Sequence, residues 1–267
     1  MRDKVAIITG SSRGIGKATA IALGDAGCIV ILNGRSESRL KEAVSDLLSL
    51  GIRAEGIAGD LSDPQVAEAL VEEVVNRHGR LDILVNNAGL SMRGRFDELD
   101  PEVFTEILNA NVINAMNMAR FALPHLQPSE GSLVFVSSVV GLRALPMTSV
   151  YSAAKMALTG LAEALRMENK KQGVHIGVVY VGYTQNAPDK TTMNAQGELV
   201  LLKPREGGVA DSPEGVARLI LSNIQKRKFK SVHSLPGKLN SVMNRFFPSL
   251  VETALYAIYK RKPELFE

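Results

Sequence analysis

A glycine-rich turn near the start of the chain restricts its fold more than any other feature. Residues 4–9 read Lys-Val-Ala-Ile-Ile-Thr, which predicts a buried strand, and an alanine-rich helix is predicted to end at about residue 26. Between them stand Gly10, Gly14 and Gly16. Glycine allows a tight turn and a close backbone approach, and the N-terminus of the next helix presents N–H groups to an anion. The order strand, glycines, helix therefore predicts a phosphate-binding turn, and a plain glycine-rich loop is the less favoured interpretation.

Strand and helix patterns then alternate along most of the chain. The predicted strands cover 28–33, 53–58, 81–85, 131–136, 174–180 and 229–233, and the predicted helices cover 36–50, 63–78, a segment from 100, and 212–226. Asp63-Pro64 and Asp100-Pro101 each predict a helix start, with a capping carboxylate before proline at the first helical position. No linker or repeat interrupts the alternation. We expect residues 1–267 to form a single α/β domain, a doubly wound parallel sheet (Rossmann-type) of about seven strands with helices on both faces.

Composition limits the chemistry that is open to the chain. Hydrophobic residues make up 45% and charged residues 22% of the 267 residues, as in an ordinary soluble protein. Cys28 is the only cysteine, so no intrachain disulfide can form, and the four histidines are scattered without ligand spacing, so no metal site is expected. The N-terminal apolar run is too short for a signal peptide, and no run approaches the ~18 apolar residues of a membrane span. A cytoplasmic location is therefore expected.

Tyr151 and Lys155 are four residues apart in Tyr-Ser-Ala-Ala-Lys, so on a helix they share one face. A phenol keeps its proton until about pH 10, and a nearby ammonium favours the phenolate. Lowering the phenol pKa by roughly three units takes about 4 kcal/mol, which is reachable where water is partly excluded. Alone the pair is a weak signal, since a half-buried ring beside a solvated amine is the commoner arrangement. In its context the pair predicts general acid–base catalysis.

The second predicted strand ends in Asn33-Gly34-Arg35. At this corner dinucleotide-binding folds place an acid on the ribose hydroxyls, and no acid stands there. Arg35 and Arg13 can instead converge on a 2′-phosphate, which a carboxylate would repel. NADP(H) is therefore the expected cofactor, rather than NAD(H).

Several further motifs follow in order: Asp60-Leu61, Asn86-Asn-Ala-Gly89, Asn111 and Ser137-Ser138. With the glycine turn and Tyr151-x-x-x-Lys155, they make the chain resemble the short-chain dehydrogenase/reductase family in its compact, single-domain form, over nearly the whole length. The resemblance implies that Ser138, thirteen residues before Tyr151, positions a substrate carbonyl, and that Ser137 is structural. It also implies that Asn111 holds a water that relays protons toward Lys155.

The resemblance further implies a cofactor site in which Asn86–Gly89 steadies the central strand near the adenine and Asp60-Leu61 borders the adenine ring. Its expected members are Gly10, Ser12, Arg13, Gly14, Ile15, Gly16, Asn33, Arg35, Asp60, Leu61, Asn87, Ala88, Gly89, Tyr151, Lys155, Gly182 and Thr184. The chain departs from the family after the sixth strand, where Val181 replaces the usual proline. The threonine that contacts the cofactor in the family is then matched by Thr184, or its place is taken by Asn186.

These features together predict an NADP(H)-dependent oxidoreductase that interconverts a ketone or aldehyde and an alcohol. Residues 139–147 are mostly apolar, which favours a bulky apolar substrate (lipid-like, steroid-like or acyl), and residues 183–210 are polar and irregular, as expected of a substrate lid. A non-catalytic NADPH-binding regulator is the alternative. A nucleic-acid-binding role is not expected, because the basic tail has no stacking-aromatic pattern.

Residues 234–267 form a C-terminal extension in which 246–259 is a predicted helix. The helix carries one apolar stripe: Leu250, Val251, Ala254, Leu255, Ile258 and Tyr259. We expect this stripe to cover the substrate mouth or an interface of a homo-oligomer (dimer or tetramer). Residues 224–267 hold nine Lys/Arg and three Glu, a charge of +6 in a chain of +3. A peripheral contact of this basic helix with a membrane is the less favoured alternative.

Overall fold

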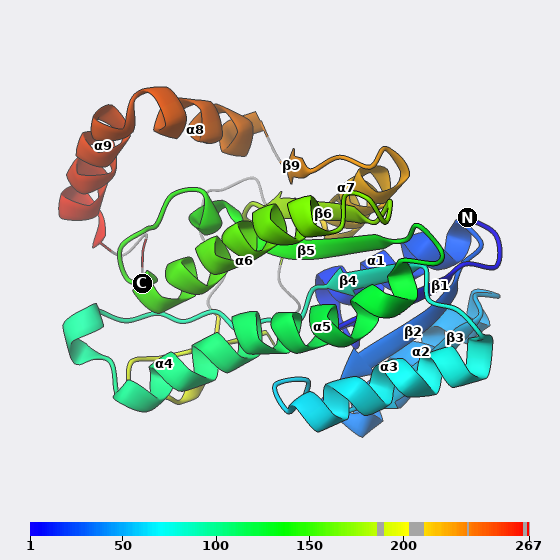
Figure 1. Ribbon diagram of the computed structural model, residues 1–267. Helices are drawn as coiled ribbons and strands as arrows, with labels where there is room; N and C mark the ends of the chain where they lie inside the picture. The colour runs from blue at the N-terminus through cyan, green and yellow to red at the C-terminus, as the bar shows by residue number, and fades with distance from the viewer. Residues whose placement is uncertain (186–189, 203–210, 234, 264–265, 267) are drawn as a thin grey trace.

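The computed structural model describes residues 1–185, 190–202, 211–233, 235–263 and 266. Its centre is a parallel sheet of seven strands in the order β3-β2-β1-β4-β5-β6-β9 (Figure 1). The strands span Val5–Ile8 (β1), Ile29–Gly34 (β2), Ala54–Ala58 (β3), Ile83–Asn86 (β4), Ser132–Ser138 (β5), His175–Val181 (β6) and Lys230–Val232 (β9). The order reverses at β1, whose neighbours are β2 and β4. The predicted doubly wound sheet is confirmed.

Helices cover both faces of the sheet and create two cores. One core lies under α3 (Pro64–His78), α5 (Asn114–Leu126) and α6 (Ser149–Glu168), and the other lies under α1 (Gly14–Asp25), α2 (Glu37–Ser49) and α7 (Pro213–Gln225). Within β1, Ile7 packs in the first core and Ile8 in the second, because successive side chains of a strand point to opposite faces. Both faces are buried, so the central strands read as continuous apolar runs rather than alternating ones.

Two of the four described helices that begin with proline are capped by a side chain. Asp63 accepts a hydrogen bond at 2.8 Å from the backbone N–H of Gln65 at the start of α3. Ser212 likewise accepts one at 3.1 Å from Gly215 at the start of α7. At α4 (Pro101–Leu108) the expectation was wrong in part: the helix begins at Pro101, but the Asp100 side chain makes no capping bond. The Asp100 N–H instead donates to the carbonyl of Ala195 at 2.9 Å, a long-range contact that no local pattern announces.

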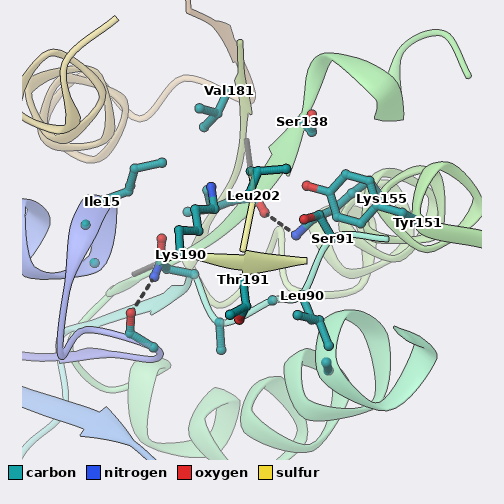
Figure 2. A pocket seen from close by; sticks show the side chains of 18 of the residues that line it. Ile15, Leu90, Ser91, Ser138, Tyr151, Lys155, Val181, Lys190, Thr191 and Leu202 are labelled. Carbon is teal, nitrogen blue, oxygen red and sulfur yellow. Dashed lines mark hydrogen bonds between the residues drawn. The ribbon is translucent and has the colours of Figure 1, made fainter. Parts of the chain in front are cut away.

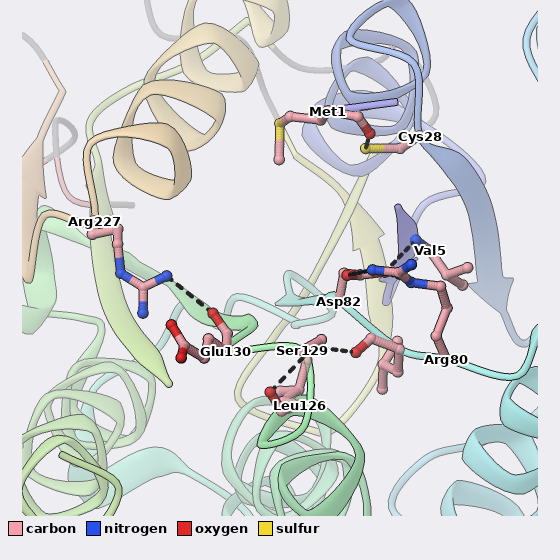
Figure 3. Close-up of polar contacts among 10 residues, drawn as sticks. Met1, Val5, Cys28, Arg80, Asp82, Leu126, Ser129, Glu130 and Arg227 are labelled. Atoms are coloured by element: carbon pink, nitrogen blue, oxygen red, sulfur yellow. Dashed lines mark hydrogen bonds and ion pairs between the residues drawn. The ribbon is translucent and has the colours of Figure 1, made fainter. Parts of the chain in front are cut away.

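The amino ends of the central strands are held by a buried carboxylate (Figure 3). Asp82, just before β4, accepts a hydrogen bond at 2.9 Å from the backbone N–H of Val5 and two from the guanidinium of Arg80, at 2.6 and 2.8 Å. A buried carboxylate is tolerated because these charge-assisted bonds satisfy it. This cluster fixes the register of β1 against β4 at the end of the sheet opposite to the ligand edge.

The segment expected to be irregular contains an antiparallel hairpin, β7 (Thr191–Met193) with β8 (Leu199–Leu201). Met193 is bound on both sides, since its N–H donates to Ser91 and its carbonyl accepts from Arg93, each at 2.9 Å. Three-residue strands leave little trace in a sequence, and this pairing is made with a segment a hundred residues earlier. Residues 186–189 and 203–210 of the expected lid lie outside the described residues.

The C-terminal extension folds as two helices, α8 (Leu235–Phe246) and α9 (Pro248–Arg261), set off at one side of the sheet in Figure 1. The single predicted helix over 246–259 was wrong at its start, because Phe247 has φ −135° and ψ 55° and Pro248 opens a new helix. The predicted stripe is divided: Val251, Leu255 and Tyr259 are half-buried, whereas Leu250, Ala254 and Ile258 are exposed. Among the described residues, no helix combines the length and apolar character needed to cross a membrane.

The two Asp-Pro helix starts predict different sensitivities to substitution. Asp63→Ala should lower the free energy of unfolding by about 1 kcal/mol, because it removes an N-cap hydrogen bond. Asp100→Ala is the matched control and should cost clearly less, because it removes no such bond. Urea unfolding followed by circular dichroism measures both, and equal losses would show that the cap of α3 contributes nothing of its own.

Candidate active site

A large cavity of about 1190 Å³ opens at the carboxyl ends of the strands (Figure 2). In an open parallel sheet this edge is where ligands bind, at the point where the strand order reverses. Every residue expected to bind the cofactor lines this cavity, from Gly10 on the first turn to Thr184 after β6. Ser138, Tyr151 and Lys155 line the same space.

The glycine-rich turn is tied to the segment after β4 by a small hydrogen-bond network. The hydroxyl of Thr9 accepts from the backbone N–H groups of Asn87 and Ala88, both at 3.0 Å. The amide of Asn87 donates back to the carbonyls of Thr9 at 2.9 Å and Gly10 at 3.0 Å. The resemblance implied that this segment steadies the central strand near the adenine, and these bonds join the segment to the turn that follows β1.

The glycines meet the steric demands of a phosphate cradle. Gly10 has φ +61°, and a Cβ there would come within 2.8 Å of the Cα of Ala88. A Cβ on Gly16 would lie 2.6 Å from the Asn87 amide nitrogen and 2.7 Å from the Cα of Ser11. Gly14, at φ +55°, faces open space on the cavity side. The residues present thus fit a nicotinamide dinucleotide: the backbone approaches closely, and α1 begins without a capping side chain or an acid in its first turn.

The corner after β2 is rich in guanidinium groups. Arg35 pairs with Asp60 at 3.8 Å, and both side chains remain more than half exposed. Although burial opposes it, hydrogen bonds from Ser62 and the charge of Arg35 lower the pKa of the Asp60 carboxyl. Arg13 and Arg39 line the same part of the cavity. The sequence analysis did not include Arg39 among the cofactor-binding residues. Its position in the first turn of α2, directly after the ribose corner, could have indicated it.

Tyr151 and Lys155 stand one turn apart on α6, and Ser138 ends β5 beside them (Figure 2). The Ser138 hydroxyl neighbours the Tyr151 phenol and acts to lower its pKa. The Lys155 ammonium is buried, donates to the carbonyl of Val136 at 3.1 Å, and lies 5.7 Å from the centre of the Tyr151 ring. Ser137 donates a hydrogen bond to the carbonyl of Lys155 at 2.9 Å, which ties β5 to α6 and agrees with the structural role expected of it.

The charges at this cluster differ from the simple expectation for the pair. Burial raises the pKa of the Tyr151 phenol, and the opposing effects come from the Ser138 hydrogen bond and the charge of Arg93 rather than from Lys155. Burial, with the like charge of Lys190, lowers the pKa of Lys155 to about 8. The ammonium is thus drawn toward losing its proton near neutral pH, which suits a proton carrier.

Asn111 lies in a π-helical turn, Asn109–Ile113, between α4 and α5. Its amide nitrogen donates to the carbonyls of Leu90 at 2.8 Å and Ile107 at 2.9 Å, which assigns the amide orientation. Its buried carboxamide oxygen has no hydrogen-bond partner among the described residues. That oxygen and the Lys155 ammonium flank Gly89, because a Cβ added there would meet them at 2.5 and 3.1 Å.

The segment that follows β6 departs from the family pattern. β6 continues through Val181, where the family has proline, and the Thr184 hydroxyl donates to the Gly182 carbonyl at 3.2 Å. Thr184 is buried and lines the cavity, whereas Asn186, the other candidate for the cofactor contact, lies outside the described residues.

Two cations in the cavity were not singled out from the sequence. Arg93 and Lys190 line it, and burial together with the charges of Arg13 and Arg93 lowers the pKa of Lys190. In Figure 2 the Lys190 side chain lies between Ile15 at the start of α1 and Leu202. Neither residue belongs to a short motif, and a backbone hydrogen bond at 2.9 Å from Arg93 to the Met193 carbonyl joins their two segments.

The comparison with protein families agrees with this geometry. Residues 4–197 match the family model described as short chain dehydrogenase. The chain belongs to the short-chain dehydrogenase/reductase family. It is 31% identical over 261 residues to dehydrogenase/reductase SDR family member 7B of Danio rerio, covering 94% of this chain and 84% of that protein.

Two further similarities have more specific names. A 3beta-hydroxysteroid dehydrogenase of Mediterraneibacter gnavus is 32% identical over 173 residues, or 64% of this chain and 63% of that protein. The solved alcohol dehydrogenase of the archaeon Thermococcus sibiricus, complexed with 5-hydroxy-NADP, superposes with a TM-score of 0.75 at 27% identity, covering 86% of this chain and 96% of that one. As a member of this family, the protein is a nicotinamide-dependent oxidoreductase that acts on CH–OH or C=O groups.

The depressed pKa of Lys155 can be measured directly. In the cofactor-free protein, 13C NMR of the lysine ε-carbons should show one amine titrating at about 8, well below the ~10.4 of an ordinary lysine. Lys190→Gln should move this midpoint upward, because it removes a like charge that disfavours the ammonium. Lys170→Gln, at an exposed site in the turn after α6, should leave it unchanged. If the Lys190 substitution leaves the midpoint unchanged, the charge of Lys190 does not affect the pKa of Lys155.

Proposed function

We propose that the protein is an NADP(H)-dependent reductase or dehydrogenase of a bulky, apolar carbonyl compound. The observation that carries the proposal is the meeting of Ser138, Tyr151 and Lys155 on one wall of a cavity whose other wall is a dinucleotide cradle. The chemistry supplied by the bound nicotinamide is hydride transfer to or from the substrate carbon.

In the direction of reduction, the Tyr151 hydroxyl donates its proton to the carbonyl oxygen as charge develops there. Ser138 donates a hydrogen bond to the same oxygen and stabilises that charge. Burial keeps the phenol protonated, which suits a general acid, and Ser138 counters this when the phenolate forms. Lys155 stabilises that phenolate and, following the family, holds the ribose of the nicotinamide.

Replacement of the lost proton runs through Lys155 and Asn111. The unpartnered Asn111 oxygen and the Lys155 ammonium border one small volume above Gly89, where a water can bridge them. Since the pKa of Lys155 is lowered to about 8, the ammonium can pass a proton on and regain it near neutral pH. This supports Asn111 as the fourth member of the catalytic group.

NADP(H) is preferred in this proposal because of the corner beside β2. Arg13, Arg35 and Arg39 line that part of the cavity, and Asn33 stands where an acid would otherwise bind the ribose hydroxyls. The acid nearby, Asp60, follows the next strand, β3, and pairs with Arg35. Guanidinium groups bind a phosphate with charge-assisted hydrogen bonds, so the corner favours the 2′-phosphate.

The apolar side of the cavity supports a bulky substrate. Apolar residues that line the cavity include Leu90, Val139, Val140, Leu145, Pro146, Leu199, Leu202 and Phe266. Phe266 comes from the C-terminal extension and is buried, so the tail contributes to this wall. A steroid-like, acyl or other lipid-like carbonyl compound would bury its surface against these residues, whereas a sugar would leave hydroxyls unpaired.

We further propose a homo-oligomer in the cytoplasm. Leu108, Ile113 and Met116, on α4, the π-turn and α5, are each more than a third exposed, which supports a subunit contact through these elements. Cys28 is a buried free thiol, in keeping with a reducing compartment.

Substitution of Tyr151 separates this enzyme from the rival, a non-catalytic NADPH-binding regulator. Tyr151→Phe should reduce kcat by at least 100-fold while the Kd for NADPH changes little, because only the transferable proton is lost. Tyr256→Phe, at an exposed site on α9, is the control. NADPH oxidation with a panel of aliphatic, steroid-like and acyl-thioester ketones measures turnover. A wild-type protein that binds NADPH and oxidises it with none of the panel would favour the regulator.

Substitution of Arg35 tests the cofactor preference. Arg35→Asp should shift the ratio of kcat/KM for NADPH over NADH by roughly 10–100-fold toward NADH, since a charged hydrogen bond worth about 1.5–3 kcal/mol is replaced by repulsion. Arg35→Gln should weaken NADPH use without improving NADH use, because it adds no acceptor for the ribose. An unchanged ratio in both variants would mean that Arg35 does not meet the 2′-phosphate.

A further inference from the structure

Both helices of the C-terminal extension present apolar side chains to solvent. On α8, Leu239, Val242 and Phe246 follow the i, i+3, i+7 spacing of one helix face and are 64%, 54% and 65% exposed. On α9, Leu250 and Ile258 are 58% and 44% exposed, and Phe247 at the joint is 57% exposed. We call these six residues the tail patch. Isolated exposed side chains need no explanation, but six in one short segment mark a binding surface.

The opposite side of the extension is attached to the body of the protein. Arg143, in the loop that borders the cavity, pairs with Glu252 at 3.3 Å and donates to the Asn244 carboxamide at 3.4 Å. The Asn244 amide donates to the Leu142 carbonyl at 3.0 Å, and the Tyr259 hydroxyl donates to the Met147 sulfur at 4.0 Å. These contacts orient both helices. The tail patch therefore faces solvent because specific contacts hold the opposite side of the extension against the protein.

The charge of the extension indicates what covers the patch. By sequence, α8 and α9 carry four basic residues (Lys238, Arg245, Lys260 and Arg261) and one acid (Glu252), a net charge of +3. The single acid is already paired with Arg143. A second copy of the chain is a poor partner, because a two-fold contact places the same surface on both sides and would bring these cations together. An anionic lipid surface satisfies both the apolar and the basic side chains.

We propose that α8 and α9 form an interfacial anchor that binds the surface of a membrane containing anionic lipid. Phe246, Phe247, Leu250 and Ile258 would enter the boundary between headgroups and acyl chains, and Arg245, Lys260 and Arg261 would contact the phosphates. Lys262 and Phe266 line the cavity, so the anchor sets the cavity rim close to the lipid. A lipid-like substrate could then reach the site without crossing water. The anchor itself does not depend on the proposed chemistry.

Vesicle flotation of the full-length protein, without substrate, tests the anchor. The protein should float with vesicles of phosphatidylcholine mixed with phosphatidylglycerol and bind pure phosphatidylcholine much more weakly. Phe246→Ser with Leu250→Ser should weaken binding at least tenfold, since two apolar side chains no longer leave water. Leu48→Ser with Leu50→Ser, an equally exposed pair at the end of α2, is the matched control and should bind as the wild type does.

The charge contribution is tested in the same way. Lys260→Gln with Arg261→Gln should weaken binding to the mixed vesicles roughly 30-fold, because each basic residue near an anionic surface contributes about fivefold. Lys170→Gln with Lys171→Gln should have no effect. Circular dichroism melting of each variant checks that the fold is intact, and turnover of a small water-soluble ketone should be unchanged in the tail variants, so loss of lipid binding is separable from loss of catalysis.

Three results would overturn the proposal. They are a wild-type protein that does not float with the mixed vesicles, a tail pair that binds like its control pair, and binding that is indifferent to Lys260 and Arg261. Light scattering identifies the main rival: if the Phe246/Leu250 variant changes the mass in solution while vesicle binding is absent throughout, the tail patch is an interface between copies of this chain.

Discussion

The close approach of Gly10 to Ala88 is the contact on which the rest of the site depends. It occurs between the turns that follow β1 and β4, neighbouring strands in the middle of the sheet. A side chain at position 10 would push these turns apart, and the Thr9–Asn87 hydrogen bonds that join them would be lost. The same turns form the floor of the cavity, carry the N-terminus of α1, and place Gly89 against Asn111 and Lys155. One steric constraint therefore connects the cofactor cradle to the catalytic wall.

The second organising feature is an excess of positive charge inside the cavity. Arg13, Arg93, Lys155 and Lys190 influence one another strongly enough that burial and like charges together lower the pKa of both lysines. Gathering cations in a partly buried space is unfavourable for the folded chain alone. The arrangement is favourable only toward an anion, and a nicotinamide dinucleotide carries one in its pyrophosphate. The positive charges that lower the pKa values of the two lysines are thus the charges that would attract an anionic cofactor.

The C-terminal extension adds a property that the sheet does not have. Polar contacts through Arg143 and Asn244 fasten it beside the loop that borders the substrate side of the cavity. This leaves two apolar helix faces outside and one aromatic side chain, Phe266, inside. The same segment therefore carries an exposed apolar surface and part of the cavity wall. A molecule that binds to this surface would lie close to the entrance of the cavity.

The sequence by itself determined the order of strands and helices, the glycine turn and the Tyr151–Lys155 pair, because each depends on neighbours a few residues away. It also indicated the absence of an acid at the ribose corner, since the corner is formed by consecutive residues. Tertiary structure decided the rest. The hairpin at Thr191–Leu201, the contacts of Asp100 and the cavity positions of Arg93 and Lys190 arise from pairing between segments far apart in the chain. Likewise, the 3.6-residue period of α9 predicted an apolar stripe on one helix face. Only the packing of α9 on the Arg143 loop divided this stripe into a half-buried part and an exposed part. The physical reason is that periodicity specifies which side chains share a helix face but not what packs against that face.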